Sequence, residues 1–116
     1  MGDPTERDVF FGPVINQRAV ERYERAIAQA KREGTVLLGG ERLRGTLFDR
    51  GHFVAPTVAR LGLESTLYQE ELFVPFLAVG EVSDLDQALA EANRVEYGLT
   101  AGIFSRDQDE VARFFD

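Results

Sequence analysis

The chain has 116 residues, of which 44% are hydrophobic, and a formal net charge of -7. This length and composition fit one small globular domain, and the acidic balance argues against nucleic acid or an anionic membrane surface as the main partner. There is no cysteine and only one histidine, His52, which excludes disulfides, thiolate metal sites and multi-histidine metal sites. Because no signal peptide or membrane-length apolar run is visible, we expect a cytoplasmic protein.

After 15 irregular residues, a helix is predicted from the capping residue Asn16 to Gly34, which would end it as a left-handed cap. Its buried stripe recurs at spacings of three and four residues: Ala19, Val20, Tyr23, Ala26, Ile27 and Ala30. The arginines Arg18, Arg22 and Arg25 are predicted to form a solvated face of this helix.

The middle of the chain is predicted to hold strands at 35–38, 53–58 and 73–79, a hairpin or loop at 41–51, and a helical turn at 67–72. Pro56 lacks an amide donor, which predicts an edge or a bulge for the second strand. Pro75 is expected to limit pairing of the third strand on one side.

The last third is predicted to begin with a helix capped by Ser83 and extending to Ala92. A strand at 100–104 and a helix from Ser105 to Asp116 follow. Alternating strands and helices indicate an α/β fold with a mostly parallel sheet. Since the last helix carries apolar residues up to the end of the sequence, we expect residues 1–116 to be one segment of a larger domain, truncated at both ends.

The stretch from Gln69 to Phe76 sets two carboxylates and an aromatic ring before an apolar run. A carboxylate at the edge of a sheet can accept hydrogen bonds from sugar hydroxyls, and residues two apart in an extended chain lie on the same side. The pattern therefore suits a ligand with a ribose and a flat heterocycle. On spacing alone, an exposed helix end before a core strand is the more frequent explanation of such a pattern.

Several motifs in the same order resemble the NAD(P)-dependent aldehyde dehydrogenase superfamily. They are Gly2-Asp3-Pro4, Gly12-Pro13, Leu37-Leu38-Gly39-Gly40, Gly51-His52-Phe53-Val54-Ala55-Pro56-Thr57-Val58, Glu70-Glu71-Leu72-Phe73 and Tyr97-Gly98-Leu99-Thr100. The resemblance covers essentially the whole chain. It is strongest to the branch that oxidises glutamate semialdehyde, the open form of 1-pyrroline-5-carboxylate, in proline catabolism.

The resemblance implies a middle segment of the catalytic domain of an oxidoreductase that converts an aldehyde to a carboxylic acid, with NAD or NADP as cofactor. In this family a cysteine thiolate attacks the aldehyde, and a glutamate acts as the base that releases the acid. Both would lie outside this chain, which contains no cysteine. We therefore expect the isolated chain to be inactive and to bind no cofactor.

By the resemblance, Glu71 matches the residue that accepts hydrogen bonds from the nicotinamide ribose, and Phe73 matches the aromatic beside the nicotinamide ring. Val74 departs from the family, which commonly has glycine there. If that glycine has a positive φ or allows a close backbone approach, Val74 alters the cofactor pocket; if the position is extended, Val74 is harmless.

Two hypotheses of different classes follow. In the first, the chain is a catalytically incomplete part of an aldehyde dehydrogenase whose full subunits form a homo-oligomer. In the second, it is a stand-alone α/β module for binding or assembly, without catalysis. In both we expect self-association, because a partial domain exposes apolar surface.

Overall fold

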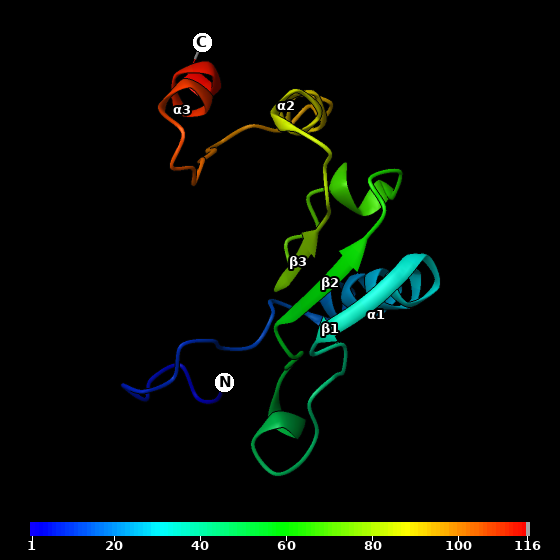
Figure 1. Cartoon of the computed structure of the whole chain (residues 1–116). Helices are drawn as coiled ribbons and strands as arrows, with labels where there is room; N and C mark the ends of the chain where they lie inside the picture. The colour runs from blue at the N-terminus through cyan, green and yellow to red at the C-terminus, as the bar shows by residue number, and fades with distance from the viewer. Residues whose placement is uncertain (116) are drawn as a thin grey trace. The chain divides into compact units, whose positions relative to one another are not determined.

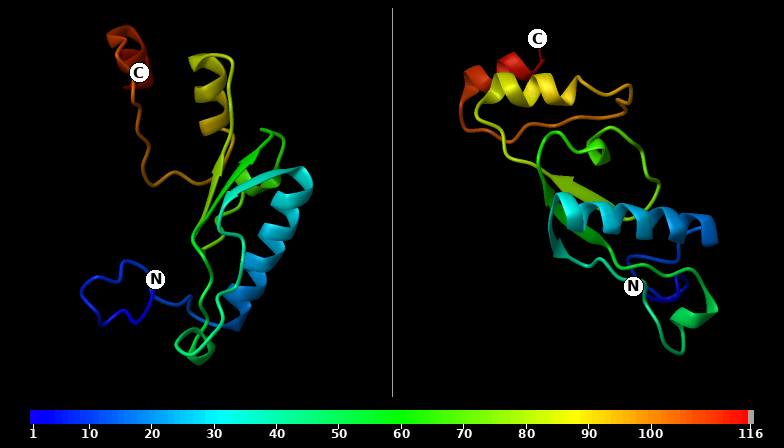
Figure 2. Two further views of the ribbon diagram at one scale, coloured as in Figure 1. Left: turned by 60° about the horizontal axis from the view of Figure 1, so that its bottom comes forward. Right: turned by 90° about the vertical axis from the view of Figure 1, so that its right-hand side faces the viewer.

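The computed structural model describes residues 1–115, and the chain divides into two compact units, Met1–Gly80 and Glu81–Asp116. In the first unit, β1 (Gly34–Leu38), β2 (Thr57–Leu61) and β3 (Phe76–Val79) form a sheet in the order β1-β2-β3. The helix α1 (Gln17–Glu33) lies along one face of this sheet (Figures 1 and 2). Among the described residues, no helix is long and apolar enough to cross a bilayer.

The predicted helix α1 is confirmed, including its cap: the Asn16 side chain accepts a hydrogen bond from the Ala19 amide at 3.0 Å. The predicted stripe is buried throughout. Gly34 ends the helix, but the predicted left-handed cap is wrong, because its φ is -169°. Glycine is needed there for a different reason. The backbone of Gly34 lies so close to the carbonyl oxygen of Arg60 that a Cβ would collide with it.

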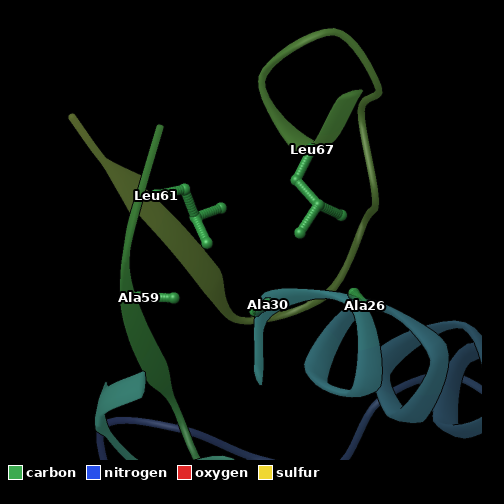
Figure 3. Close-up of a cluster of buried hydrophobic side chains, with 5 residues drawn as sticks. All are labelled: Ala26, Ala30, Ala59, Leu61 and Leu67. Carbon is green, nitrogen blue, oxygen red and sulfur yellow. The ribbon is translucent and has the colours of Figure 1, made fainter. Parts of the chain in front are cut away.

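The core lies between α1 and the sheet. Figure 3 shows Leu61 of β2 and Leu67 pointing into the space above Ala26 and Ala30 of α1. Leu67 belongs to a short 3-10 helix, η2 (Thr66–Tyr68), so the helical turn predicted at 67–72 begins one residue earlier and ends at Tyr68. A second cluster joins Val20, Tyr23 and Ile27 of α1 to Val54, and further half-buried side chains pack on both clusters.

The prediction of a mostly parallel sheet is wrong. β2 pairs with β3 in parallel, but β1 pairs with β2 in antiparallel fashion. A parallel connection needs a crossover of a dozen or more residues, usually through a helix. The chain between β1 and β2 holds only the short 3-10 helix η1 (Phe48–Arg50), and it returns as a hairpin extension in which the Leu43 amide donates to Phe53 O at 3.0 Å.

Pro56 and Pro75 each directly precede the first residue of a strand. The strands predicted at 53–58 and 73–79 start later, at Thr57 and Phe76, each directly after a proline. A proline cannot donate to the ladder, so regular pairing begins at the next residue. Of the two alternatives predicted for the second strand, the edge position is wrong, because β2 lies in the middle of the sheet. The β1–β2 ladder does have an irregularity, which lies in β1 between Val36 and Leu38.

The second unit contains α2 (Leu85–Ala92) and α3 (Gln108–Phe115). Their caps differ from the prediction: Asp84, not Ser83, accepts from the Gln87 amide at 2.8 Å, and Asp107, not Ser105, accepts from the Asp109 amide at 2.8 Å. The strand predicted at 100–104 is absent. A strand needs a neighbour to pair with, and the described part of this unit contains no other strand. Asp116, the predicted last helical residue, lies outside the described residues.

A buried hydroxyl pair joins α1 to the turn after β1. The hydroxyls of Tyr23 and Thr57 are 2.7 Å apart, and each lies 2.9 Å from the carbonyl oxygen of Ala55. The Gly40 amide donates to the Thr57 hydroxyl at 2.9 Å. Because every member has a partner, this network holds the Gly39-Gly40 turn against the helix without leaving a buried polar group unsatisfied.

This network predicts a loss of stability at high pH. Burial raises the pKa of the Tyr23 hydroxyl above its ordinary value of 10.0, so the folded chain holds this proton more tightly than the unfolded chain does. The stabilisation that the protonated Tyr23 hydroxyl provides is complete below pH 10 and is lost as the pH rises toward the pKa of Tyr23 in the folded chain. Urea unfolding between about pH 8 and about pH 11 should therefore show falling stability. The Tyr23→Phe variant should show a shallower fall; an equal fall would contradict this origin.

Candidate functional site

The candidate cofactor segment, Gln69 to Phe76, leads from η2 into β3 without regular structure over most of its length. Glu71 is exposed, so its carboxylate is accessible to a ligand. Phe73 is 78% exposed although it is aromatic. The two predicted residues therefore lie on the surface, two positions apart, rather than inside a packed core.

Phe73 has an unusual backbone. Its φ is 50°, and it is the one non-glycine residue with positive φ among the described residues. A left-handed backbone is uncommon for a bulky side chain, because the Cβ approaches the neighbouring carbonyl. The prediction that residue 73 begins the strand is thus wrong, and the reason is local: this φ breaks the extended path before Pro75.

The prediction that Arg22 lies on a solvated face of α1 is wrong. The Arg22 side chain is half-buried, and its Nε donates a hydrogen bond to the carbonyl oxygen of Leu72 at 2.6 Å. No signal in the sequence separates Arg22 from Arg18 and Arg25, since each of the three directly precedes a buried residue of the stripe. Arg18 and Arg25 are exposed, as predicted.

Val74 anchors the other side of Phe73. Its side chain packs on the cluster that contains Val20, Tyr23 and Val54, and its φ is not positive. The left-handed position in this segment belongs to Phe73, one residue earlier. A positive φ, the first of the two reasons considered for a glycine at this position, is therefore absent at Val74.

An open groove lies beside this segment. It has a volume of about 670 Å³ and is lined by Phe11, Gly12, Pro13, Val14, Ile15, Arg22, Phe73, Val74 and Pro75. Its size falls in the range of small-molecule sites, and its lining combines apolar side chains with one guanidinium. The structure thus brings Phe73 next to the segment before α1, whereas Glu71 does not line this groove.

Replacing Val74 with the glycine common in the family should destabilise the chain. The Val74→Gly variant loses a half-buried apolar side chain and gains backbone freedom when unfolded, which together cost roughly 1–3 kcal/mol. Urea unfolding of both proteins measures this difference. An equal or higher stability of the glycine variant would mean that Val74 is strained.

The profile described as "Aldehyde dehydrogenase family" matches residues 1–116. The chain belongs to the aldehyde dehydrogenase family.

Among curated relatives, the 1-pyrroline-5-carboxylate dehydrogenase 1 of Halalkalibacterium halodurans is 40% identical over 96% of this chain and 21% of its own length. The alpha-ketoglutaric semialdehyde dehydrogenase of Bacillus subtilis is 33% identical over 100% of this chain and 24% of its own length. The chain therefore spans about a fifth of the length of the curated relatives it matches.

Solved structures of dehydrogenases also match this chain. The 1-pyrroline-5-carboxylate dehydrogenase from Thermus, solved with bound NAD, matches with a TM-score of 0.78 and 38% identity over 88% of this chain and 19% of its own. The structure of 3,6-anhydro-L-galactose dehydrogenase in complex with NAP matches with a TM-score of 0.90 and 32% identity over 98% of this chain and 24% of its own. The resemblance to the 1-pyrroline-5-carboxylate dehydrogenase branch, inferred from the motifs, is thus supported by both kinds of comparison.

Proposed function

We propose that these 116 residues work as a segment of the catalytic domain of an NAD(P)-dependent aldehyde dehydrogenase, and that Glu71 and Phe73 bind the nicotinamide–ribose end of its cofactor. The observation that carries the proposal is the left-handed, 78% exposed Phe73 two residues from an exposed carboxylate. A strained backbone that exposes an aromatic ring is typical of a ligand-binding position.

The chemistry of these two residues fits the cofactor. An ionised carboxylate has two oxygens and can accept charge-assisted hydrogen bonds from both hydroxyls of a ribose. An exposed aromatic face suits a flat heterocycle and shields it from water. The surface carboxylate and the ring thus match the two parts of a nicotinamide riboside, and both are accessible without any change in the core.

In the reaction, NAD(P) supplies the acceptor for the hydride of the aldehyde. Glu71 fixes the ribose, which sets the position of the attached ring, and Phe73 limits how far that ring can move. Their contribution is therefore positioning, which is effective because a misplaced reactant lowers the rate steeply. The nucleophilic thiolate must come from outside this chain, which has no cysteine.

The proposed substrate is an aldehyde that carries a carboxylate, with glutamate semialdehyde favoured. This rests on the relatives named for 1-pyrroline-5-carboxylate and on one named for alpha-ketoglutaric semialdehyde. Homo-oligomerisation of the full subunit and self-association of the chain stay predictions.

Replacing Phe73 with alanine should weaken binding of the nicotinamide in particular. In the full-length subunit, we expect Phe73→Ala to lower the affinity for NADH by roughly tenfold, the effect of losing one stacked ring contact of about 1–2 kcal/mol. The affinity for ADP-ribose, which lacks the nicotinamide, should change little. Fluorescence titration with NADH and competition by ADP-ribose measure both.

The matched control is Leu77→Ala, which removes another exposed apolar side chain, 57% accessible, from β3. An equal loss of NADH affinity in both variants would contradict a specific role of Phe73. If cells contained only a 13.0 kDa product, the non-catalytic module would be the better description.

A further inference from the structure

Burial of the Phe73 side chain does not explain its left-handed backbone, because this side chain is 78% exposed. A left-handed backbone at a bulky residue persists only when neighbouring structure holds it. The groups that hold it must therefore act on the main chain to either side of the ring.

On the C-terminal side, the main chain is anchored to the core and to the sheet. Val74 packs on the Val20, Tyr23 and Val54 cluster, and the carbonyl oxygen of Pro75 accepts from the Thr57 amide at 2.9 Å. These contacts fix the chain that leaves Phe73.

On the N-terminal side, the Leu72 side chain packs on the cluster that contains Ala26 and Leu61, and its carbonyl oxygen accepts a hydrogen bond from Arg22 Nε at 2.6 Å. The peptide group is planar, so the Leu72 carbonyl turns together with the Phe73 amide. Rotation about the N–Cα bond of Phe73, which is its φ, swings this carbonyl away from any fixed donor. A donor held at hydrogen-bond distance from Leu72 O therefore restrains φ of Phe73.

Arg22 is such a fixed donor. It lies on α1 between Val20 and Tyr23, which are 0% and 1% exposed, so its backbone is tied to the core. The side chain is half-buried, and a guanidinium donating to a carbonyl makes a charge-assisted bond.

We propose that Arg22 is a positioning residue: by holding the Leu72 carbonyl, it maintains the left-handed backbone of Phe73 and so presents the Phe73 ring to the cofactor. The last step rests on the proposed function, whereas the effect on the backbone does not.

The backbone effect is testable on the 116-residue chain itself by NMR. A positive φ brings the amide proton close to the Hα of the same residue, so the intraresidue nuclear Overhauser effect at Phe73 should be strong. We expect it to be lost in Arg22→Met, which keeps the apolar stem but removes the donor, and to be restored in Arg22→Lys. The control Arg25→Met removes an exposed arginine of the same helix and should leave it unchanged. A strong effect retained in Arg22→Met would overturn the proposal.

A measurement on the unsubstituted chain covers the case in which Arg22→Met does not fold. The Arg22 Nε–H should exchange with solvent more slowly than the Arg25 Nε–H, because the Arg22 Nε–H donates a hydrogen bond to the Leu72 carbonyl. Equal exchange rates would overturn the proposal.

The cofactor step is tested in the full-length subunit. Arg22→Met should lower the affinity for NADH several-fold and leave that for ADP unchanged, with Arg22→Lys restoring it. If Phe73→Ala weakens NADH binding but Arg22→Met does not, positioning by Arg22 is wrong. If Phe73→Ala itself has no effect, the proposed function fails, and the NMR result still decides the backbone effect.

Discussion

Replacing Glu71 with alanine is expected to lower kcat/KM for NAD(P) by roughly 100-fold in the full-length subunit. The variant loses the charge-assisted hydrogen bonds to the ribose, and one hydrogen bond to a charged group makes a net contribution of about 1.5–3 kcal/mol. A net loss of about 2.7 kcal/mol corresponds to this factor. Steady-state kinetics with varied cofactor at saturating aldehyde measures it, and thermal unfolding of the same samples checks that the fold is intact.

Glu70→Ala is the matched control for this prediction. It removes an equally charged and likewise exposed neighbour that is not proposed to touch the cofactor. We expect a change of less than about threefold, which reflects only the screened surface charge. Equal losses in both variants would indicate that the segment attracts or repels the cofactor by net charge and that Glu71 makes no specific contact.

Replacing Gly39 with alanine is expected to destabilise the first unit by about 3 kcal/mol, from a steric clash and a left-handed backbone combined. The φ of Gly39 is 72°, and a Cβ there would collide with Pro56 O and lie 2.8 Å from Thr57 Oγ1. Pro56 O is a backbone atom directly before the central strand, so this clash cannot be relieved by moving a flexible side chain. Urea or thermal unfolding measures the loss.

Gly45→Ala separates the two contributions. Gly45 also has a positive φ, 106°, but a Cβ at this position would meet no atom within 4 Å. Its substitution should cost only the backbone strain, about 1 kcal/mol. If Gly39→Ala were no worse than Gly45→Ala, the close packing of the Gly39-Gly40 turn on β2 would be contradicted.

The elements with strong local signals can be predicted from the sequence. The helix α1 has a capping residue, a six-residue buried stripe and a glycine at its end, and the structure confirms each except the conformation of Gly34. Strand β1 is also predicted within one residue of its observed start. Pro56 and Pro75 are expected to interrupt pairing, but only the structure shows that the ladders start directly after them.

Features that depend on distant partners could not be predicted. The direction of β1 relative to β2 depends on the connection between them, and the sequence of residues 41–51 fits a hairpin or a loop, which leaves the direction open. The segment 100–104 has the pattern of a strand but no strand to pair with among the described residues of its unit. At the site, the left-handed backbone of Phe73 and the bond from Arg22, fifty residues before Leu72, leave no local signature, since neither residue type favours that role by itself.

The most direct test of the central claim is the affinity of the full-length subunit for ADP-ribose and for ADP, with and without Glu71→Ala. ADP-ribose contains the ribose that Glu71 is proposed to hold, and ADP lacks it. We predict that Glu71→Ala weakens ADP-ribose binding by roughly tenfold or more, which corresponds to at least about 1.4 kcal/mol, and leaves ADP binding unchanged. Equal affinities of the variant and the unsubstituted protein for ADP-ribose would contradict the assignment of Glu71 to the cofactor ribose.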